Sequence, residues 1–325
     1  MDSQLTDTNT GKPHQHPFLY FEDGDLELSA ETCDGSRQLF RVYQAQLRRV
    51  SPVFRDMLAL GGARDEVVVM PDAAEDIAAL LESIYIPSSL TRKLKHTPPS
   101  RTAIELAGLV RAAKKYGVDD VADITIEHVE AQWPQSLEVW DIQYPLWMAQ
   151  LCFPEKVQDV PEPVSAIRFG REFGLTTTIL PAAYYMLAVQ SYKAETAPSP
   201  QANVARWELA DHEILLNIIR GRDQLRSRFM GQLGQMKCHT VKQAATCDHA
   251  KVAIIGKLLR GDDAPSLREQ WDYLKLAQLL RVSVSAQCDI CPHCKAKISN
   301  RMQAARLDTW ASLPVYFGIT SVAGT

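Results

Sequence analysis

The chain has 325 residues, of which 46% are hydrophobic and 23% are charged. These are the proportions of a globular protein, and they exclude a fibrous repeat or a chain that is disordered throughout. The net charge of −4, from 35 basic and 39 acidic side chains, excludes a polycationic nucleic-acid coat and a long acidic tail.

Apolar runs in the sequence are too short for a membrane span. The longest one, residues 179–189, has about half of the ~20 residues that a transmembrane helix needs. The first 16 residues are polar and lack the apolar core of a secretory signal. We therefore expect no membrane contact, a disordered leader over residues 1–16, and an intracellular protein of the cytoplasm or the nucleus.

Short strands are expected near the start of the chain. Two apolar runs, at residues 26–28 and 39–42, flank an Asp-Gly turn and are typical of a β-hairpin. Residues 66–70 predict a third strand. Between hairpin and third strand, two short helices are expected to meet at Ser51-Pro52, where serine can cap the second helix and proline fits its first turn.

The pattern after the third strand is helical. Apolar residues recur at helical spacing over about 72–85, 101–116 and 119–133, whereas the basic, proline- and serine-containing residues 87–100 predict a loop. The rest of the chain predicts further helices joined by proline-rich connectors. The expected segments are 137–151, 163–174, 179–193, 203–220, 222–234, 249–259, 266–280 and 295–311.

Several segments match a known family in their order and spacing. They are Asp25-Leu26, Phe40–Gln44, Leu47, Ser51–Met57, Val67–Met70, Leu80–Tyr85 and Ala113–Val118. Together they resemble a BTB/POZ domain over residues 18–131. One departure is Tyr43-Gln44, where the family often has His-Lys near its dimer and partner surfaces, so the resemblance does not identify a partner.

The C-terminal region also resembles part of a family. A Cys-x-x-Cys pair at Cys291 and Cys294 precedes an R-x-x-x-W-x-x-L-P-x-x-F-G motif, as in fungal BTB-domain proteins. The motif residues are Arg306, Trp310, Leu313, Pro314, Phe317 and Gly318.

The resemblance implies an α+β protein. It implies a BTB/POZ fold, with a short three-stranded sheet flanked by helices, followed by an all-helical region over residues 137–320. The implied function is protein–protein interaction, as a homodimer that recruits a further protein. Leu47, Phe54 and Leu58 either fill the core or face a partner, and we take them as interface candidates.

Two other functions stay open. One is a substrate adaptor of a cullin-type ubiquitin ligase, although the apolar-x-Glu signature expected after Ser51 is absent from the sequence. The other is a zinc-containing regulator that binds nucleic acid through a run of basic residues. A helix face exposed to solvent explains the same basic residues more simply. These are Arg220, Arg222, Arg226, Arg228, Lys237 and Lys242.

Cysteines are the sharpest candidates for chemistry. Cys238 and Cys247, followed by the pair Cys291 and Cys294, can supply four thiolates to one structural Zn²⁺ ion. The alternatives are free thiols packed as small apolar side chains, or redox use. Cys288 is a spare ligand, and His239, His249 and His293 are alternatives nearby.

Catalytic motifs are missing from the sequence. It contains no G-x-S-x-G, H-E-x-x-H, P-loop or G-x-G-x-x-G pattern. We therefore expect no enzyme activity.

Overall fold

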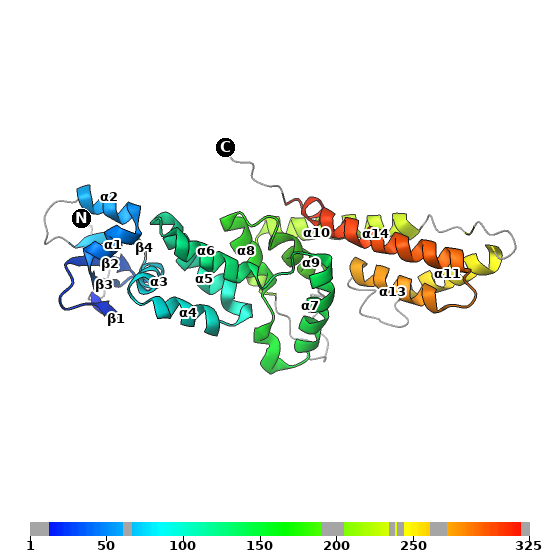
Figure 1. The fold of residues 1–325 in the computed structure, drawn as a ribbon, viewed down its shortest axis with the longest axis horizontal. Helices are drawn as coiled ribbons and strands as arrows, with labels where there is room; N and C mark the ends of the chain where they lie inside the picture. Colours follow the sequence, from blue (N-terminus) through cyan, green and yellow to red (C-terminus); the bar gives the residue numbers. More distant parts are fainter. Residues whose placement is uncertain are drawn as a thin grey trace, which may run out of the picture. The chain divides into compact units, whose positions relative to one another are not determined.

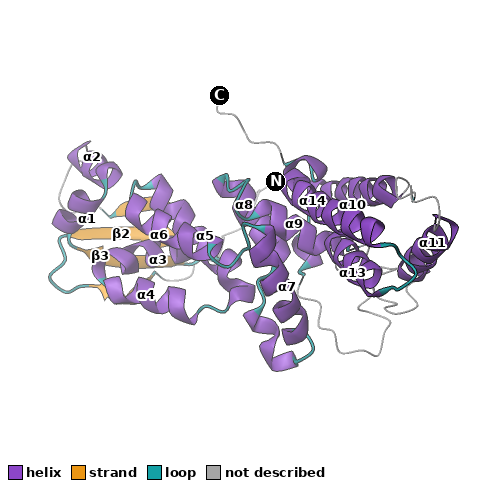
Figure 2. Ribbon diagram, turned by 45° about the vertical axis from the view of Figure 1, so that its right-hand side comes forward, coloured by secondary structure: helices purple, strands orange, loops and turns teal. Residues whose placement is uncertain are grey.

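The computed structural model describes residues 13–60, 67–189, 205–233, 238, 244–260 and 272–319. The chain divides into two compact units: residues 1–98 with 102–131, and residues 99–101 with 132–325. Among the described residues, strands occur in the first unit alone and the second unit is helical (Figures 1 and 2). The expected α+β class is confirmed.

The sheet of the first unit has four strands. They are β1 (His14–Tyr20), β2 (Leu26–Glu31), β3 (Arg37–Val42) and β4 (Val68–Ala73), in the order β1-β3-β2-β4. The central strands β2 and β3 are antiparallel, which confirms the predicted hairpin. The edge strands are parallel to their neighbours, β1 to β3 and β4 to β2.

Strand β1 corrects two expectations, the three-stranded sheet and the extent of the leader. It begins at His14, inside the expected leader, whereas residues 1–12 lie outside the described residues. Residues 14–20 lack an alternating apolar pattern because a histidine takes one of the inward positions. The His16 ring is 9% exposed and stacks on Phe40 at 5.4 Å, and it accepts a hydrogen bond from the Leu19 amide.

Six helices complete the described part of the first unit. Helix α3 packs on the sheet, and its buried face includes Ile77, Leu80 and Leu81. The helices are α1 (Gln44–Val50), α2 (Pro52–Leu60), α3 (Ala74–Tyr85), α4 (Pro87–His96), α5 (Pro99–Lys115) and α6 (Asp119–Glu130).

The joint between α1 and α2 is formed as the sequence predicts. Pro52 occupies the first position of α2, and the Ser51 hydroxyl accepts a hydrogen bond from the Phe54 amide at 2.9 Å. The same hydroxyl donates to the Tyr116 carbonyl, which ties the joint to the end of α5. This small buried serine therefore fixes both the helix start and its packing.

Helix α4 corrects the expectation of a loop over residues 87–100. Pro87 needs no amide partner at the first helical position, so the segment is compatible with a helix start. Leu90 and Leu94, four residues apart, are half-buried, and none of the residues of α4 is fully buried.

Two of the interface candidates belong to the core of the first unit. Leu47 and Phe54 are both 0% exposed, and the Phe54 ring stacks on Tyr116 at 4.7 Å. Neither side chain offers surface to a partner, which corrects their assignment to an interface. Leu58 is half-buried.

The second unit is built around α9 (Leu180–Val189), in which every residue is buried. This accounts for the longest apolar run of the sequence, and no helix in the described ranges is long and apolar enough to span a membrane. The other helices are α7 (Leu137–Gln150), η1 (Pro154–Asp159), α8 (Pro163–Phe173), η3 (Trp207–Leu209), α10 (His212–Leu233), α11 (Ala244–Arg260), α13 (Tyr273–Ala286) and α14 (Pro292–Tyr316).

Helix α10 corrects the expectation of two helices, over 203–220 and 222–234. It continues through Gly221, where the absence of a side chain lets α10 lie directly against the Phe317 ring. A glycine inside a helical pattern here marks a close approach and not a helix end.

The C-terminal motif has a structural role in the second unit. The Arg306 guanidinium is buried, donates to the Leu274 carbonyl at 3.1 Å, and pairs with Asp141 of α7. Phe317 is 0% exposed, and Gly318 has a φ of +63°, the left-handed conformation that favours glycine at a helix end. The motif therefore fastens α14 to α7, α10 and α13.

Candidate metal centre

Four cysteines from separate parts of the sequence lie together in the second unit. The Sγ atoms of Cys238, Cys247, Cys291 and Cys294 are all within 4.8 Å of one another, and those of Cys247 and Cys291 are 4.0 Å apart. The four residues that the sequence singled out as metal ligands are thus brought to one place. None of the four forms a disulfide bond.

The start of α14 positions two of the four thiols. Cys291 is the N-cap residue, Pro292 follows at the first helical position, and Cys294 lies in the first turn. The Cys294 amide donates to the Cys291 sulfur at 3.4 Å, so this sulfur takes the place that a serine oxygen commonly has at a helix N-terminus. The Cys-x-x-Cys spacing therefore aims both sulfurs to one side of the turn.

Cys247 reaches the same point from α11, which packs against α13, and α13 packs against α14. Apolar side chains surround the four cysteines and keep the site closed to water, among them Ile254, Ile290 and Ile298. The exposed fractions of the cysteines are 9%, 0%, 6% and 3% in chain order.

Burial affects the protonation of the thiols. Desolvation raises the pKa of Cys247, and desolvation together with the neighbouring sulfurs raises the pKa of Cys294 to about 12. Loss of the thiol protons is therefore unfavourable without a metal, whereas a soft cation would replace these protons and bind all four sulfurs.

A charged pair lies beside the cysteines on α11. Lys251, 3% exposed, has its Nζ 3.9 Å from the Cys294 sulfur and 2.6 Å from Asp248. Burial lowers the pKa of Lys251, but the hydrogen bond to Asp248 and the nearby thiols outweigh this and raise the pKa above its ordinary value. The lysine is therefore a buried cation next to a candidate ligand.

The geometry fits a tetrahedral metal ion. With Zn–S bonds of about 2.3 Å, tetrahedral sulfurs lie about 3.8 Å apart, so the four sulfurs need to close by less than about 1 Å from their spread of up to 4.8 Å. Four thiolates fill the coordination shell and leave no position for water or substrate, which is typical of structural sites and not of catalytic ones.

The structure separates the other candidate ligands from the cluster. Cys288, His249 and His293 are exposed and do not belong to the group of four. His239 lies outside the described residues. Cys288, the first cysteine of the Cys-x-x-Cys-x-x-Cys run, is thus exposed to solvent and is not one of the four candidate ligands.

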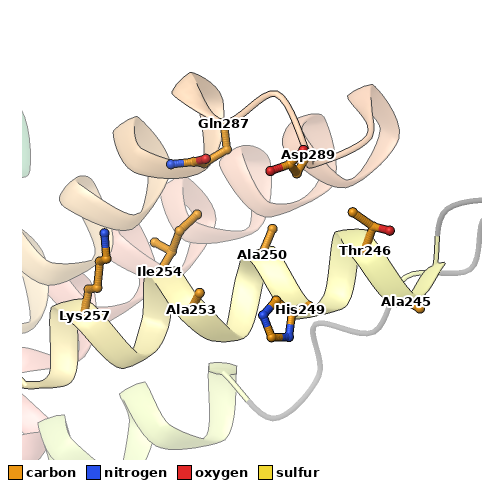
Figure 3. A pocket seen from close by; sticks show the side chains of 9 residues that line it. All are labelled: Ala245, Thr246, His249, Ala250, Ala253, Ile254, Lys257, Gln287 and Asp289. Carbon is orange, nitrogen blue, oxygen red and sulfur yellow. The ribbon is translucent and has the colours of Figure 1, made fainter.

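A groove that sequence reasoning did not anticipate runs beside α11. It lies between one face of α11 and the loop that leads to Cys291, with small residues such as Ala250 and Ala253 along α11 (Figure 3). Its polar lining comes from Thr246, His249 and Lys257 of α11 and, across from this helix, from Gln287 and Asp289. Asp289, which lines the groove, lies two residues before the metal-ligand candidate Cys291 in the sequence.

The basic stretch around residue 220 is partly engaged within the unit. Arg222 donates to the Ala188 carbonyl at 2.7 Å, at the end of α9, and Arg228 pairs with Asp308 of α14. Lys237 and Lys242 lie outside the described residues. These contacts favour a structural role for the two arginines over contact with nucleic-acid phosphates.

No protein-family model, curated protein or solved structure matches this chain. The likeness to BTB/POZ domains therefore stays a prediction from the sequence.

Proposed function

We propose that the chain is a non-enzymatic protein–protein interaction module whose helical second unit is held together by one structural Zn²⁺ ion. The ion would be bound by Cys238, Cys247, Cys291 and Cys294. The observation that supports the zinc site is the convergence of four buried sulfurs within 4.8 Å of one another.

Zinc is favoured over other metals by the donor set. Four thiolates in a tetrahedral arrangement suit Zn²⁺ or an iron–sulfur centre, and hard cations such as Mg²⁺ or Ca²⁺ prefer oxygen ligands. The four sulfurs lie within 4.8 Å of one another, a spread that suits a single tetrahedral Zn²⁺ ion. The ion would link the start of α14 to α11 and to the segment around Cys238, so its contribution would be to the stability of the unit and not to a reaction.

For the first unit we propose a BTB/POZ-type role in self-association. Its element order, a hairpin followed by two helices, a strand and further helices, supports this proposal. Exposed apolar side chains are available for contact with a second copy. Phe18 on β1, Leu60 at the end of α2 and Val69 on β4 are 69%, 89% and 59% exposed.

Two measurements on the full chain test the two parts of the proposal. Light scattering after size exclusion should give twice the chain mass at micromolar concentration, and a monomer would remove the self-association. Metal analysis of protein purified under reducing conditions should give one zinc per chain, and a value near zero would remove the metal site.

A further inference from the structure

A metal ion bound by the four cysteines would carry a negative charge that needs a nearby cation, and Lys251 is placed to supply it. A divalent ion with four thiolates has a formal charge of −2, and such a charge is costly in an apolar pocket unless a cation compensates it. Lys251 is a charged side chain that the structure places within 4 Å of a ligand sulfur, with its Nζ 3.9 Å from the Cys294 Sγ.

The position of Lys251 follows from the helix. Lys251 comes four residues after Cys247, so both side chains project from the same face of α11. At 3% exposure its charge is little screened by water, in contrast to that of Asp248, whose side chain is 41% exposed. The positive charge therefore acts on the sulfurs more strongly than the negative charge of its partner.

Asp248 connects this cation to a second ligand. One of its oxygens, Oδ1, lies 2.6 Å from the Lys251 Nζ and also accepts a hydrogen bond from the Cys238 amide at 2.9 Å. A continuous chain of contacts thus runs from the backbone of Cys238 through Asp248 and Lys251 to the sulfur of Cys294. This chain of contacts links Cys238 to Cys294, a member of the Cys-x-x-Cys pair.

We propose that Lys251 and Asp248 are positioning residues of the metal site: Lys251 compensates the thiolate charge at Cys294, and Asp248 holds both Lys251 and the backbone of Cys238. The inference rests on the proposed zinc site. It assigns a role to two residues of the segment 247–251, Asp248 and Lys251, in which the sequence had singled out Cys247 and, as an alternative ligand, His249.

The test compares variants of the zinc-loaded full chain. Lys251→Met removes the charge and keeps an apolar stem of similar length, and Lys251→Arg keeps the charge. Asp248→Asn removes the carboxylate charge that pairs with Lys251 and keeps an acceptor oxygen for the Cys238 amide. Lys257→Met is the matched control, because Lys257 is an exposed lysine of the same helix. The readouts are zinc per chain and the rate of zinc transfer to an excess of the chromogenic chelator 4-(2-pyridylazo)resorcinol.

Lys251→Met should release zinc about 10- to 100-fold faster than the wild type, the range typical of residues that support metal ligands. Lys251→Arg should stay within a few-fold of the wild type, and Lys257→Met should match it. In cobalt-substituted protein, Lys251→Met should also move the thiolate-to-cobalt charge-transfer band to lower energy, because the Cys294 sulfur loses its donor. A packing defect alone would leave the band in place.

Equal release rates for Lys251→Met and Lys257→Met would overturn the inference while leaving the zinc site intact. If Lys251→Met does not fold, Asp248→Asn decides: faster release supports the inference, and release at the control rate overturns it. A wild-type protein without zinc would instead refute the proposed metal site, so the two failures are distinguishable.

Discussion

Gly221 of α10 lies against the ring of Phe317 so closely that a Cβ at position 221 would overlap that ring. Phe317 is fully buried and stacks on Tyr184, with the ring centroids 5.5 Å apart. A Cβ at position 221 would have to displace this packed ring, so the glycine is required by packing and not by backbone conformation.

Gly221→Ala should therefore destabilise the second unit by about 1–3 kcal/mol, the usual cost of overpacking. Helix propensity alone predicts the opposite, a gain of up to about 1 kcal/mol. Gly231→Ala is the matched control in the same helix, because nothing lies within 4 Å of its added Cβ. All six tryptophans follow residue 132, so denaturant unfolding monitored by tryptophan fluorescence reports on this unit. Equal stability of the two variants would contradict the packing.

Phe54 tests the core of the first unit. Phe54→Ala should cost about 3–5 kcal/mol, the usual loss for a buried aromatic ring, and Phe54→Asp should cost more because it buries an unpaired charge. Leu60→Ala, on the same helix, should change the free energy of unfolding by less than about 0.5 kcal/mol, since Leu60 is 89% exposed. Far-UV circular dichroism follows the transition, and a near-neutral Phe54→Asp would mean that the ring is not buried.

The turn between β2 and β3 should give the first unit a pH dependence. The Thr32 hydroxyl and the Ser36 amide donate to the Asp34 carboxylate and lower its pKa to about 2. A carboxyl with a lowered folded-state pKa stabilises the fold above its unfolded pKa of about 3.9, and this contribution is lost as the pH falls through about 2.

Asp34→Asn keeps an acceptor oxygen and removes the titration. The stability difference between wild type and Asp34→Asn should be constant above about pH 5 and should shrink as the pH falls towards 2. Urea unfolding at a series of pH values measures it. A difference that does not change over this range would show that the hydrogen bonds to Asp34 are absent in solution.

Removal of the metal should weaken the second unit selectively. Binding to the folded state alone adds about 4 kcal/mol when free zinc exceeds the dissociation constant by 1,000-fold. A chelator with a reductant should therefore lower the tryptophan-detected midpoint and leave the Phe54-sensitive transition of the first unit in place. Readdition of zinc should restore the midpoint; a chelator without effect on it would argue against a structural ion.

The sequence predicted the parts of the fold that local chemistry determines. Ser51-Pro52 specified the joint between α1 and α2, and the Asp34-Gly35 turn specified the hairpin. Strand β1 was missed because His16 occupies an inward position, where its ring stacks on Phe40. A local sequence pattern does not predict this contact. Helix α10 was divided at Gly221 because the reason for that glycine, Phe317, lies almost a hundred residues away.

The metal site shows the same division between local and distant information. The Cys-x-x-Cys turn at Cys291 and Cys294 is a local signal, and the sequence located it. The loose spacing of Cys238 and Cys247 carried less information, because their convergence depends on how α11 packs against α13 and α14. Lys251 was not anticipated at all, since a lysine on a helix ordinarily faces water.

Zinc content measured on three purified chains tests the central claim most directly. Wild type and Cys288→Ser, which changes the exposed cysteine of the same run, should each contain one zinc per chain, and Cys291→Ser should contain far less. Wild-type protein without zinc, or a Cys291→Ser variant that retains it at the level of Cys288→Ser, would contradict the account.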